Sequence, residues 1–510
     1  MVSPLPAVRI PSASFLAEVR PVEGTLPTTA LSRELALPRA ALDRPLAQAS
    51  RLPKFASPEG DFTHAAAREV DALGALYRKS LAEGLAQPPA GEIRRVGEGD
   101  LPVNLIAASP VELRAIREEG IRALRSAYYF TSGAGLWSRG GGQVKALVPF
   151  NHASLLSPEK VLRLHHANDL VNSASPADAL LMSKTPVRAG ETEEQVSRRV
   201  VDHARSTIDT LIREARSQPR ALSPLALKFA NVALASRLAE TYVPFDIATS
   251  EQTHPDIHAF VERFKRDFEG THFHPEARVQ RHIVDSLREY FHQSHLLGET
   301  HLFGYQRGFP ALHPGSGAPL PDTARIGEGA GRSKGYLDET GRTGRLLGMG
   351  KTTMVFENVE VVSDLPLIFG AHARAGRKVS VILVPQRDGL AGGNPFWVKK
   401  ADGTENLELH EQSVLPPHLV DGNAFFNSNT ILQPLDAAPP TRIGFEIKSQ
   451  GTQARAKQNS GDVTHDQPTS AIVGRPGFEY ENFKYLREYA TNGQRLIDTH
   501  RALWSEDTPR

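Results

Sequence analysis

The chain has 510 residues, with 59 Lys and Arg against 58 Asp and Glu, and it contains no cysteine. At roughly 100–200 residues per domain, this length leaves room for two to four folded units. The balanced charge argues against nucleic acid or an anionic membrane surface as a partner, since both attract basic proteins. The missing cysteine excludes disulfides, cysteine nucleophiles, iron–sulfur clusters and thiolate zinc sites.

Residues 1–60 mix proline, serine, alanine and leucine, with Phe15 and Phe55 as their aromatic residues. A segment of this kind buries too little apolar surface to offset its chain entropy, so we expect a disordered leader. Its composition resembles the leaders of bacterial type III effectors. That resemblance implies an export chaperone bound at residues 1–60, secretion, and delivery into a host cell. No uncharged stretch approaches the roughly 20 apolar residues that a membrane-spanning helix needs.

Residues 61–130 are expected to form a helical segment. Apolar residues at helical spacing predict a helix over His64–Glu83. The stretch Ser109-Pro110-Val111-Glu112 is a capping box with proline at the first helical position, and it opens a helix expected to run to about Tyr128. Gly133–Gly142 then reads as a turn-rich loop.

Residues 143–298 are expected to be mainly helical, opened by one strand. The strand is the short apolar run Val144–Phe150. Capping residues and prolines then predict successive helices that begin near Ser157, Thr192, Ser223 and Pro275, the last of them ending at Gly298.

Residues 299–510 are expected to form a strand-rich α+β domain with a C-terminal helix. Glycine, proline and aspartate turns separate short apolar runs, and helical spacing returns over Glu479–Trp504. The predicted strands are Leu302–Tyr305, Met354–Val362, Leu367–Gly370, Val379–Val384, Ala424–Phe426 and Ile443–Ile447. The fold class is therefore α+β, with a disordered leader, a helical middle and a strand-rich C-terminal half.

Histidines are concentrated between His254 and His313. His254 and His258 are four residues apart, so the two rings can share one face of a helix. Imidazoles that converge with a carboxylate suit zinc or iron, which makes a His-dependent metalloenzyme one alternative. No HExxH or similar template is present, and no metal ligand is assigned.

Two sets of residues resemble the signatures of mono-ADP-ribosyltransferases, which bind NAD in a cleft between two small sheets and transfer ADP-ribose to a protein. The first is Phe150-Asn151-His152-Ala153-Ser154 at a strand end. It is similar to the opening of His-type transferases and to a stretch of the ADP-riboxanase effectors. This resemblance implies that His152 is catalytic and that Phe150 and Ser154 bind the cofactor.

The second set follows the Arg-Ser-Glu pattern of the same family. Tyr305-Gln306-Arg307 resembles the arginine of the first strand, and Ser428 lies in a stretch that resembles the Ser-Thr-Ser strand. Glu479-Tyr480-Glu481 resembles the Glu-x-Glu of the arginine-modifying members. The resemblance implies that Glu481 and Glu479 are catalytic and that Arg307, Tyr305 and Ser428 hold NAD. The two arrangements place the first strand differently, so at most one is correct.

The sequence thus predicts an exported effector that modifies a host protein by ADP-ribosyl transfer from NAD. Two alternatives stay open. One is a non-catalytic effector that binds a host partner through its helical region, and the other is the His-dependent metalloenzyme.

Overall fold

The computed structural model describes most of the chain from residue 92 to residue 503. The described residues are 92–218, 220–250, 252–267, 277–305, 334, 337–338, 340–376, 378–386, 393–400, 402–411, 417–420, 422–437, 445–450, 453–458, 463–476 and 483–503. The expected leader 1–60 and the expected helix 64–83 lie outside these residues.

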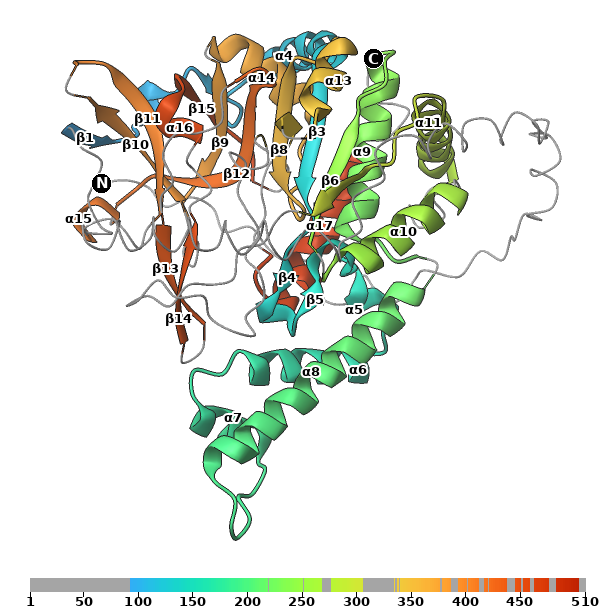
Figure 1. Cartoon of the computed structure of the whole chain (residues 1–510), viewed down its shortest axis with the longest axis vertical. Helices are drawn as coiled ribbons and strands as arrows, with labels where there is room; N and C mark the ends of the chain where they lie inside the picture. Colours follow the sequence, from blue (N-terminus) through green and yellow to red (C-terminus); the bar gives the residue numbers. More distant parts are fainter. Residues whose placement is uncertain are drawn as a thin grey trace, which may run out of the picture. The chain divides into compact units, whose positions relative to one another are not determined.

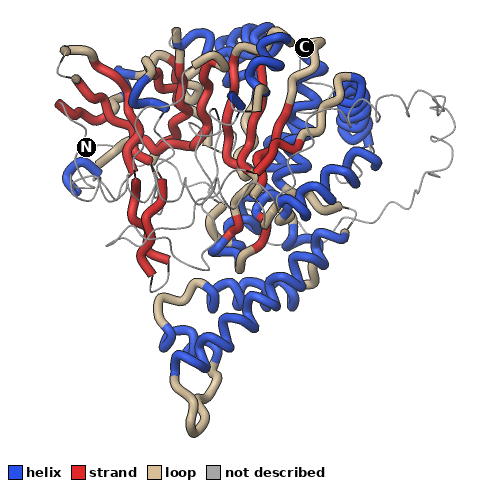
Figure 2. The backbone as a smooth tube through the Cα atoms, in the orientation of Figure 1, coloured by secondary structure: helices blue, strands red, loops and turns tan. Residues whose placement is uncertain are grey.

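A mixed sheet of eight strands forms the centre of the described part of the chain (Figures 1 and 2). Neighbouring strands pair in parallel, except that β12 runs antiparallel to both β8 and β9. In spatial order the strands are β2 (Val103–Asn104), β15 (Thr469–Val473), β9 (Val379–Pro385), β12 (Phe425–Pro434), β8 (Thr353–Asn358), β3 (Ala127–Ser132), β6 (Phe245–Thr249) and β7 (Leu302–Tyr305).

Alternate residues of the central strands enter two separate hydrophobic clusters, because successive side chains of a strand point to opposite faces. On β3, Tyr129 belongs to the larger cluster, whereas Tyr128 and Phe130 belong to the smaller one. All three are almost completely buried. The sheet is therefore covered on both faces, as is typical of mainly parallel sheets.

Most of the helices contribute to the larger cluster. The helices are α4 (Pro110–Ala123), α5 (His152–Leu155), α6 (Pro158–Val171), α7 (Pro176–Ser183), α8 (Glu193–Ser217), α9 (Pro224–Leu238), α10 (His254–Asp267), α11 (Ala277–Leu296), α13 (Arg342–Gly348), α14 (Leu365–Ala375), α15 (Pro417–Val420), α16 (Val463–Asp466) and α17 (Leu486–Leu503). Helix α9 has apolar residues all round and is buried over Pro224–Ser236, which marks it as a core helix.

The smaller cluster is covered in part by a second sheet, in which β10 (Gly393–Lys399) pairs with β1 (Glu92–Arg95) and β11 (Glu405–Glu411). The remaining described strands form two short antiparallel ribbons. They are β4 (Leu136–Trp137) with β5 (Gln143–Val144), and β13 (Phe445–Gln450) with β14 (Gln453–Gln458). The central sheet takes strands from three of the four regions expected from the sequence.

The α+β fold class is confirmed, and several local predictions are corrected. The helix that begins at Pro110 ends at Ala123, and strand β3 follows where the helix was expected to continue. The expected strand 144–150 contains instead a 3-10 turn over Lys145–Leu147, and strand β5 ends at Val144. The expected strand 367–370 lies inside helix α14, because Asp364 caps that helix through the Leu367 amide. No helix in the described ranges is long and apolar enough to cross a bilayer.

Candidate functional site

The order of the strands reverses around β3. From β3 the chain next enters the sheet at β6 on one side, continues to β7, and then returns to β8 on the other side of β3. Since β3, β6 and β8 are parallel, their carboxyl ends lie at one edge of the sheet. In open α/β sheets, ligands bind in the crevice outside the carboxyl ends at such a reversal. The segment that follows β3 is therefore the first candidate for a ligand-binding site.

That segment is the glycine-rich turn, residues 133–142, which connects β3 to β5. Gly133 packs so tightly that a Cβ there would lie 2.9 Å from the side chains of both Ile247 and Ile257. Gly141 and Gly142 have φ of 79° and 89°, a region that glycine enters at no steric cost. Gly135 is exposed, with nothing within 4 Å of its would-be Cβ. Only part of the turn is packed, and the rest is open.

Hydrogen bonds fasten the glycine-rich turn to the neighbouring strand. The Gly133 amide donates to the carbonyl of Ala248 at 2.7 Å. The buried Ser250 hydroxyl, just beyond β6, donates to the carbonyl of Ala134 at 3.1 Å. Farther along, the Gly142 amide donates to the Trp137 carbonyl at 2.9 Å and closes the β4–β5 ribbon. The start of the turn is thus held at the carboxyl end of β6.

Lys145 follows the glycine-rich turn after the two residues of β5, and its backbone amide donates to the carbonyl of Gly135. Its ammonium group donates to the Glu360 carboxylate at 2.6 Å. Glu360 lies two residues beyond the end of β8, on the other side of the strand reversal. The Lys145 and Glu360 side chains are 20% and 13% exposed, so this ion pair is partly buried and still reached by solvent. A partly desolvated ammonium beside a glycine-rich turn is suited to an anion.

Helix α10 begins five residues after the end of β6, so its amino end lies at the same edge of the sheet. The amino end of a helix carries partial positive charge and favours anions. His254 stands there, with its Nδ1 2.8 Å from the Thr249 hydroxyl. Burial and then the neighbouring His258 lower the pKa of His254.

The residues of the first predicted arrangement lie in and beside the short helix α5. His152 is fully buried, its Nδ1 is 3.1 Å from the Pro149 carbonyl, and its Nε2 has no hydrogen-bond partner within the described part of the chain. Burial lowers the pKa of His152 to about 4, so the ring is neutral at physiological pH. Phe150 is fully buried against Phe483 and Tyr489, and the exposed Ser154 hydroxyl donates to the Asn151 carbonyl.

The second arrangement falls largely outside the described residues. Arg307, Glu479 and Glu481 are not among them, and of Tyr305 only the backbone, at the end of β7, is described. Ser428 is buried in β12, where its hydroxyl donates to the Ile382 carbonyl at 2.8 Å. Ser428 and His152 belong to elements that pack against different neighbours, α5 against helices and β12 against strands.

Among the residues that the structure describes, no three histidine, aspartate or glutamate side chains gather in a way that could hold a metal ion. The rings of His254 and His258 do share a helix face, with centroids 5.9 Å apart. His301, another member of the histidine-rich stretch, is buried and bonded to the Phe245 carbonyl and to Ser294.

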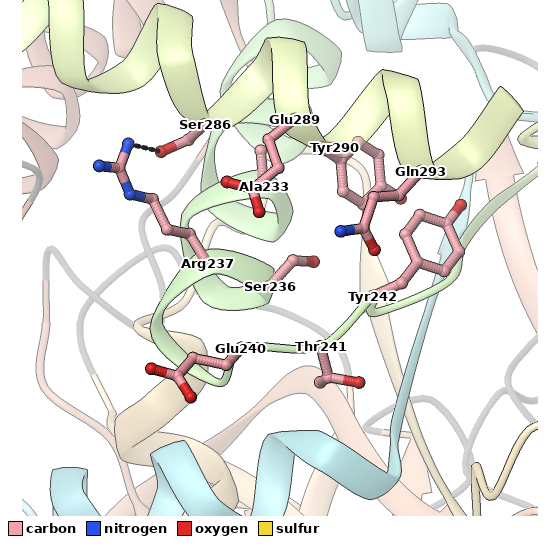
Figure 3. A pocket seen from close by; sticks show the side chains of 10 residues that line it. All are labelled: Ala233, Ser236, Arg237, Glu240, Thr241, Tyr242, Ser286, Glu289, Tyr290 and Gln293. Carbon is pink, nitrogen blue, oxygen red and sulfur yellow. Dashed lines mark hydrogen bonds between the residues drawn. The ribbon is translucent and has the colours of Figure 1, made fainter. Parts of the chain in front are cut away.

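A cavity of about 170 Å³ lies between the end of α9 and the middle of α11 (Figure 3). Arg237 reaches across it to the Ser286 hydroxyl at 3.5 Å, and Tyr242 and Tyr290 stack at one end. Tyr242, which lines the cavity, lies three residues before the start of β6 at Phe245. The glycine-rich turn instead contacts Ala248, near the end of that strand. The cavity and the turn are therefore at opposite ends of β6.

No protein-family model matches this chain, and no curated protein matches it. Solved structures do resemble it. A UDP-glucose phosphorylase of Trypanosoma brucei is 13% identical, with 83% of this chain and 74% of that chain covered and a TM-score of 0.49. A mutant UDP-glucose pyrophosphorylase of Leishmania major in complex with UDP-glucose is 12% identical, with 84% and 78% covered and a TM-score of 0.49. The UDP-glucose pyrophosphorylase of Leishmania major in open and closed forms is 13% identical, with 84% and 75% covered and a TM-score of 0.48. At such identity the comparison concerns the fold alone.

The predicted resemblance to mono-ADP-ribosyltransferases is wrong. That family was expected to bind NAD between two small sheets, whereas this chain builds one mainly parallel sheet of eight strands. The predictions that depended on the family are wrong with it: an effector delivered to a host cell, a host protein as acceptor, and NAD as cofactor.

Residues 133–142 were expected to be a turn-rich loop, with no function assigned to them. The available signal was a run of glycines followed by a lysine. It was missed because the predicted helix ran to about Tyr128, into the first residues of β3, and no strand was predicted before the turn. A glycine-rich turn indicates a phosphate site mainly when it follows a strand.

Proposed function

We propose that the chain binds a nucleotide by its phosphates at the glycine-rich turn and transfers the nucleotidyl group to a phosphorylated acceptor. One observation carries the proposal. The glycine-rich turn leaves a parallel strand where the strand order reverses, and Lys145 stands at its end with its ammonium 2.6 Å from Glu360. Glycines allow backbone amides to approach a diphosphate closely, and the lysine supplies the positive charge.

Reaction at phosphorus suits such a site because it depends on placement and charge neutralisation more than on a nucleophile from the protein. The glycine-rich turn, held to β6 through Gly133 and Ser250, supplies the placement. Lys145 supplies the charge. The Lys145 ammonium donates to the Glu360 carboxylate, and a phosphate oxygen bound at the turn would replace that contact.

Isothermal titration calorimetry tests the binding with UTP, ATP, UDP-glucose and NAD, each with magnesium chloride. We expect at least one of the first three to bind wild-type protein, and Lys145→Met to weaken that binding at least tenfold, about 1.4 kcal/mol. The matched control is Lys160→Met, which removes a partly exposed lysine on α6 that pairs with Glu214. It should leave the dissociation constant unchanged.

Pyrophosphate release from the bound triphosphate, with glucose 1-phosphate as acceptor, tests the reaction. Lys145→Met should lower kcat as well as affinity, because the lysine faces charge that develops during transfer. If the wild type binds none of the nucleotides, or if Lys145→Met binds as tightly as wild type, the phosphate site is not at the glycine-rich turn.

A further inference from the structure

The glycine-rich turn rests on the last helix of the described chain. The ring of Trp137, in the middle of the turn, stacks on Tyr489 of α17 with centroids 4.6 Å apart and planes at 29°. Phe150, beyond the turn, also stacks on Tyr489, at 5.2 Å and 28°. Tyr489 is fully buried. One residue near the C-terminus therefore contacts both the turn and the segment that leaves it.

A second set of contacts joins the turn to the beginning of α17. The Trp137 indole N–H donates to the Lys484 carbonyl at 2.7 Å. The Glu488 carboxylate accepts the Tyr485 amide at 3.0 Å and so caps the helix that carries Tyr489. One turn beyond Tyr489, a Cβ on Gly493 would lie 2.5 Å from the Phe150 carbonyl oxygen, so the helix touches the backbone there. These contacts fix both the position and the angle of α17.

The Tyr489 hydroxyl is buried and makes no hydrogen bond to any residue that the structure describes. An unpaired buried hydroxyl does not stabilise the fold, so the contribution of Tyr489 at this position comes from the packing of its ring. Burial first, and then the negative charge of Glu360, raise the pKa of Tyr489 well above its usual value. The phenol is therefore neutral, and it lies within electrostatic range of the carboxylate that holds Lys145.

We propose that Tyr489 is a positioning residue for the glycine-rich turn, so that helix α17 holds the turn, through Trp137, in the shape that receives the nucleotide phosphates. This inference rests on the proposed function. Tyr489 contacts the turn and not the nucleotide. Because it restricts the turn before the nucleotide binds, binding costs less conformational entropy.

The first experiment reads the position of the turn without any nucleotide. The chain has 3 tryptophans, so Trp397→Phe with Trp504→Phe leaves Trp137 as the sole emitter. In that background Tyr489→Leu should shift Trp137 emission to the red and raise its quenching by acrylamide, because the indole loses its stacked partner. Tyr489→Phe keeps the ring and should preserve the wild-type spectrum.

The second experiment measures the dissociation constant of the nucleotide identified by calorimetry. Tyr489→Leu should raise it at least tenfold, and Tyr489→Phe should stay within twofold of wild type. Tyr290→Leu is the matched control, because Tyr290 is an equally buried tyrosine that stacks on Tyr242, at the opposite end of β6. It should cost comparable stability and leave the dissociation constant unchanged. If Tyr489→Leu does not fold, Trp137→Phe removes the bond to Lys484 and reduces the ring area stacked on Tyr489, and it should raise the dissociation constant severalfold.

The outcomes separate the two proposals. Nucleotide binding that is unchanged in Tyr489→Leu overturns the positioning role and leaves the phosphate site intact. If Tyr489→Leu shifts the Trp137 emission but the wild-type protein binds no nucleotide, α17 holds the turn in place and the turn is not a nucleotide site. The positioning role for nucleotide binding is then overturned with the proposed function.

Discussion

Lys228 is completely buried in helix α9, beneath the central sheet. Its ammonium donates to the Glu357 carboxylate at 3.0 Å, to the Tyr129 hydroxyl at 2.5 Å and to the Val361 carbonyl. Burial lowers the pKa of Lys228, and the Glu357 charge opposes that shift. The ammonium has partners in three directions, which is what allows a charge to remain in a core.

Removing one member of this pair should be strongly destabilising. Glu357→Gln leaves the buried Lys228 ammonium without its counter-charge, and we expect the free energy of unfolding to fall by about 3–5 kcal/mol. Urea unfolding followed by circular dichroism measures the change. Breaking the surface pair Lys160–Glu214 with Glu214→Gln should cost at most about 1 kcal/mol. Equal losses for the two carboxylates would show that the Lys228 charge is not desolvated.

Helices α4 and α14 cross at two glycines. A Cβ on Gly120 would lie 1.5 Å from the Pro366 carbonyl oxygen, and one on Gly370 would lie 1.8 Å from the Ile116 carbonyl oxygen. Both obstacles are backbone atoms, which cannot rotate away as a side chain can. The close approach of the two helices therefore depends on the absence of a side chain at both positions.

Gly120→Ala should force α4 away from α14 and lower the free energy of unfolding by roughly 3 kcal/mol or more. Thermal unfolding by calorimetry gives the value. Gly344→Ala in α13 is the control, because nothing lies within 4 Å of its would-be Cβ. It should be neutral or stabilise by about 0.4–1 kcal/mol, since alanine restricts the unfolded chain. A tolerated Gly120→Ala would mean that the helices are not in backbone contact.

The molecule as a whole carries several histidines that are neutral because they are buried. Burial lowers the pKa of His152 and of His372 to about 4, and that of His301 to about 3, all from 6.5. Below pH 6.5 the unfolded chain takes up a proton at each position while the folded chain does not. The unfolded state then binds more protons, so the free energy of unfolding falls as the pH is lowered from about 6.5 toward 4.

Each such group contributes up to about 1.4 kcal/mol per pH unit within that window. His301→Asn should flatten the pH dependence between pH 6 and 4, and asparagine tolerates the φ of 64° found there. Urea midpoints across this range provide the measurement. His203→Asn, on an exposed face of α8, should leave the slope as it is. An unchanged slope in His301→Asn would contradict a neutral His301 in the folded state.

Local features were predictable from the sequence. The capping boxes at Ser109 and Thr192 begin α4 and α8 as expected, because each depends on residues three positions apart. Ser223 likewise caps α9. Such bonds form within one turn of the chain, so neighbouring residues are sufficient to specify them.

Strands β3 and β6 were not predictable in the same way. Both are buried on both faces, so Ala127–Ser132 and Phe245–Thr249 show no alternation of polar and apolar residues. The run 367–370 was ambiguous for the same reason and became helix. A short apolar segment in a covered sheet has no period of its own, and its neighbours decide whether it is strand or helix.

The sequence by itself determined where many helices begin and that the chain mixes helices with strands. Only the tertiary structure decided the strand order, and with it the site. Lys145 and Glu360 are 215 residues apart, and Trp137 and Tyr489 are also distant in sequence. Such pairs meet because a parallel sheet brings the carboxyl ends of its strands to one edge, and no local pattern records which strands will be neighbours.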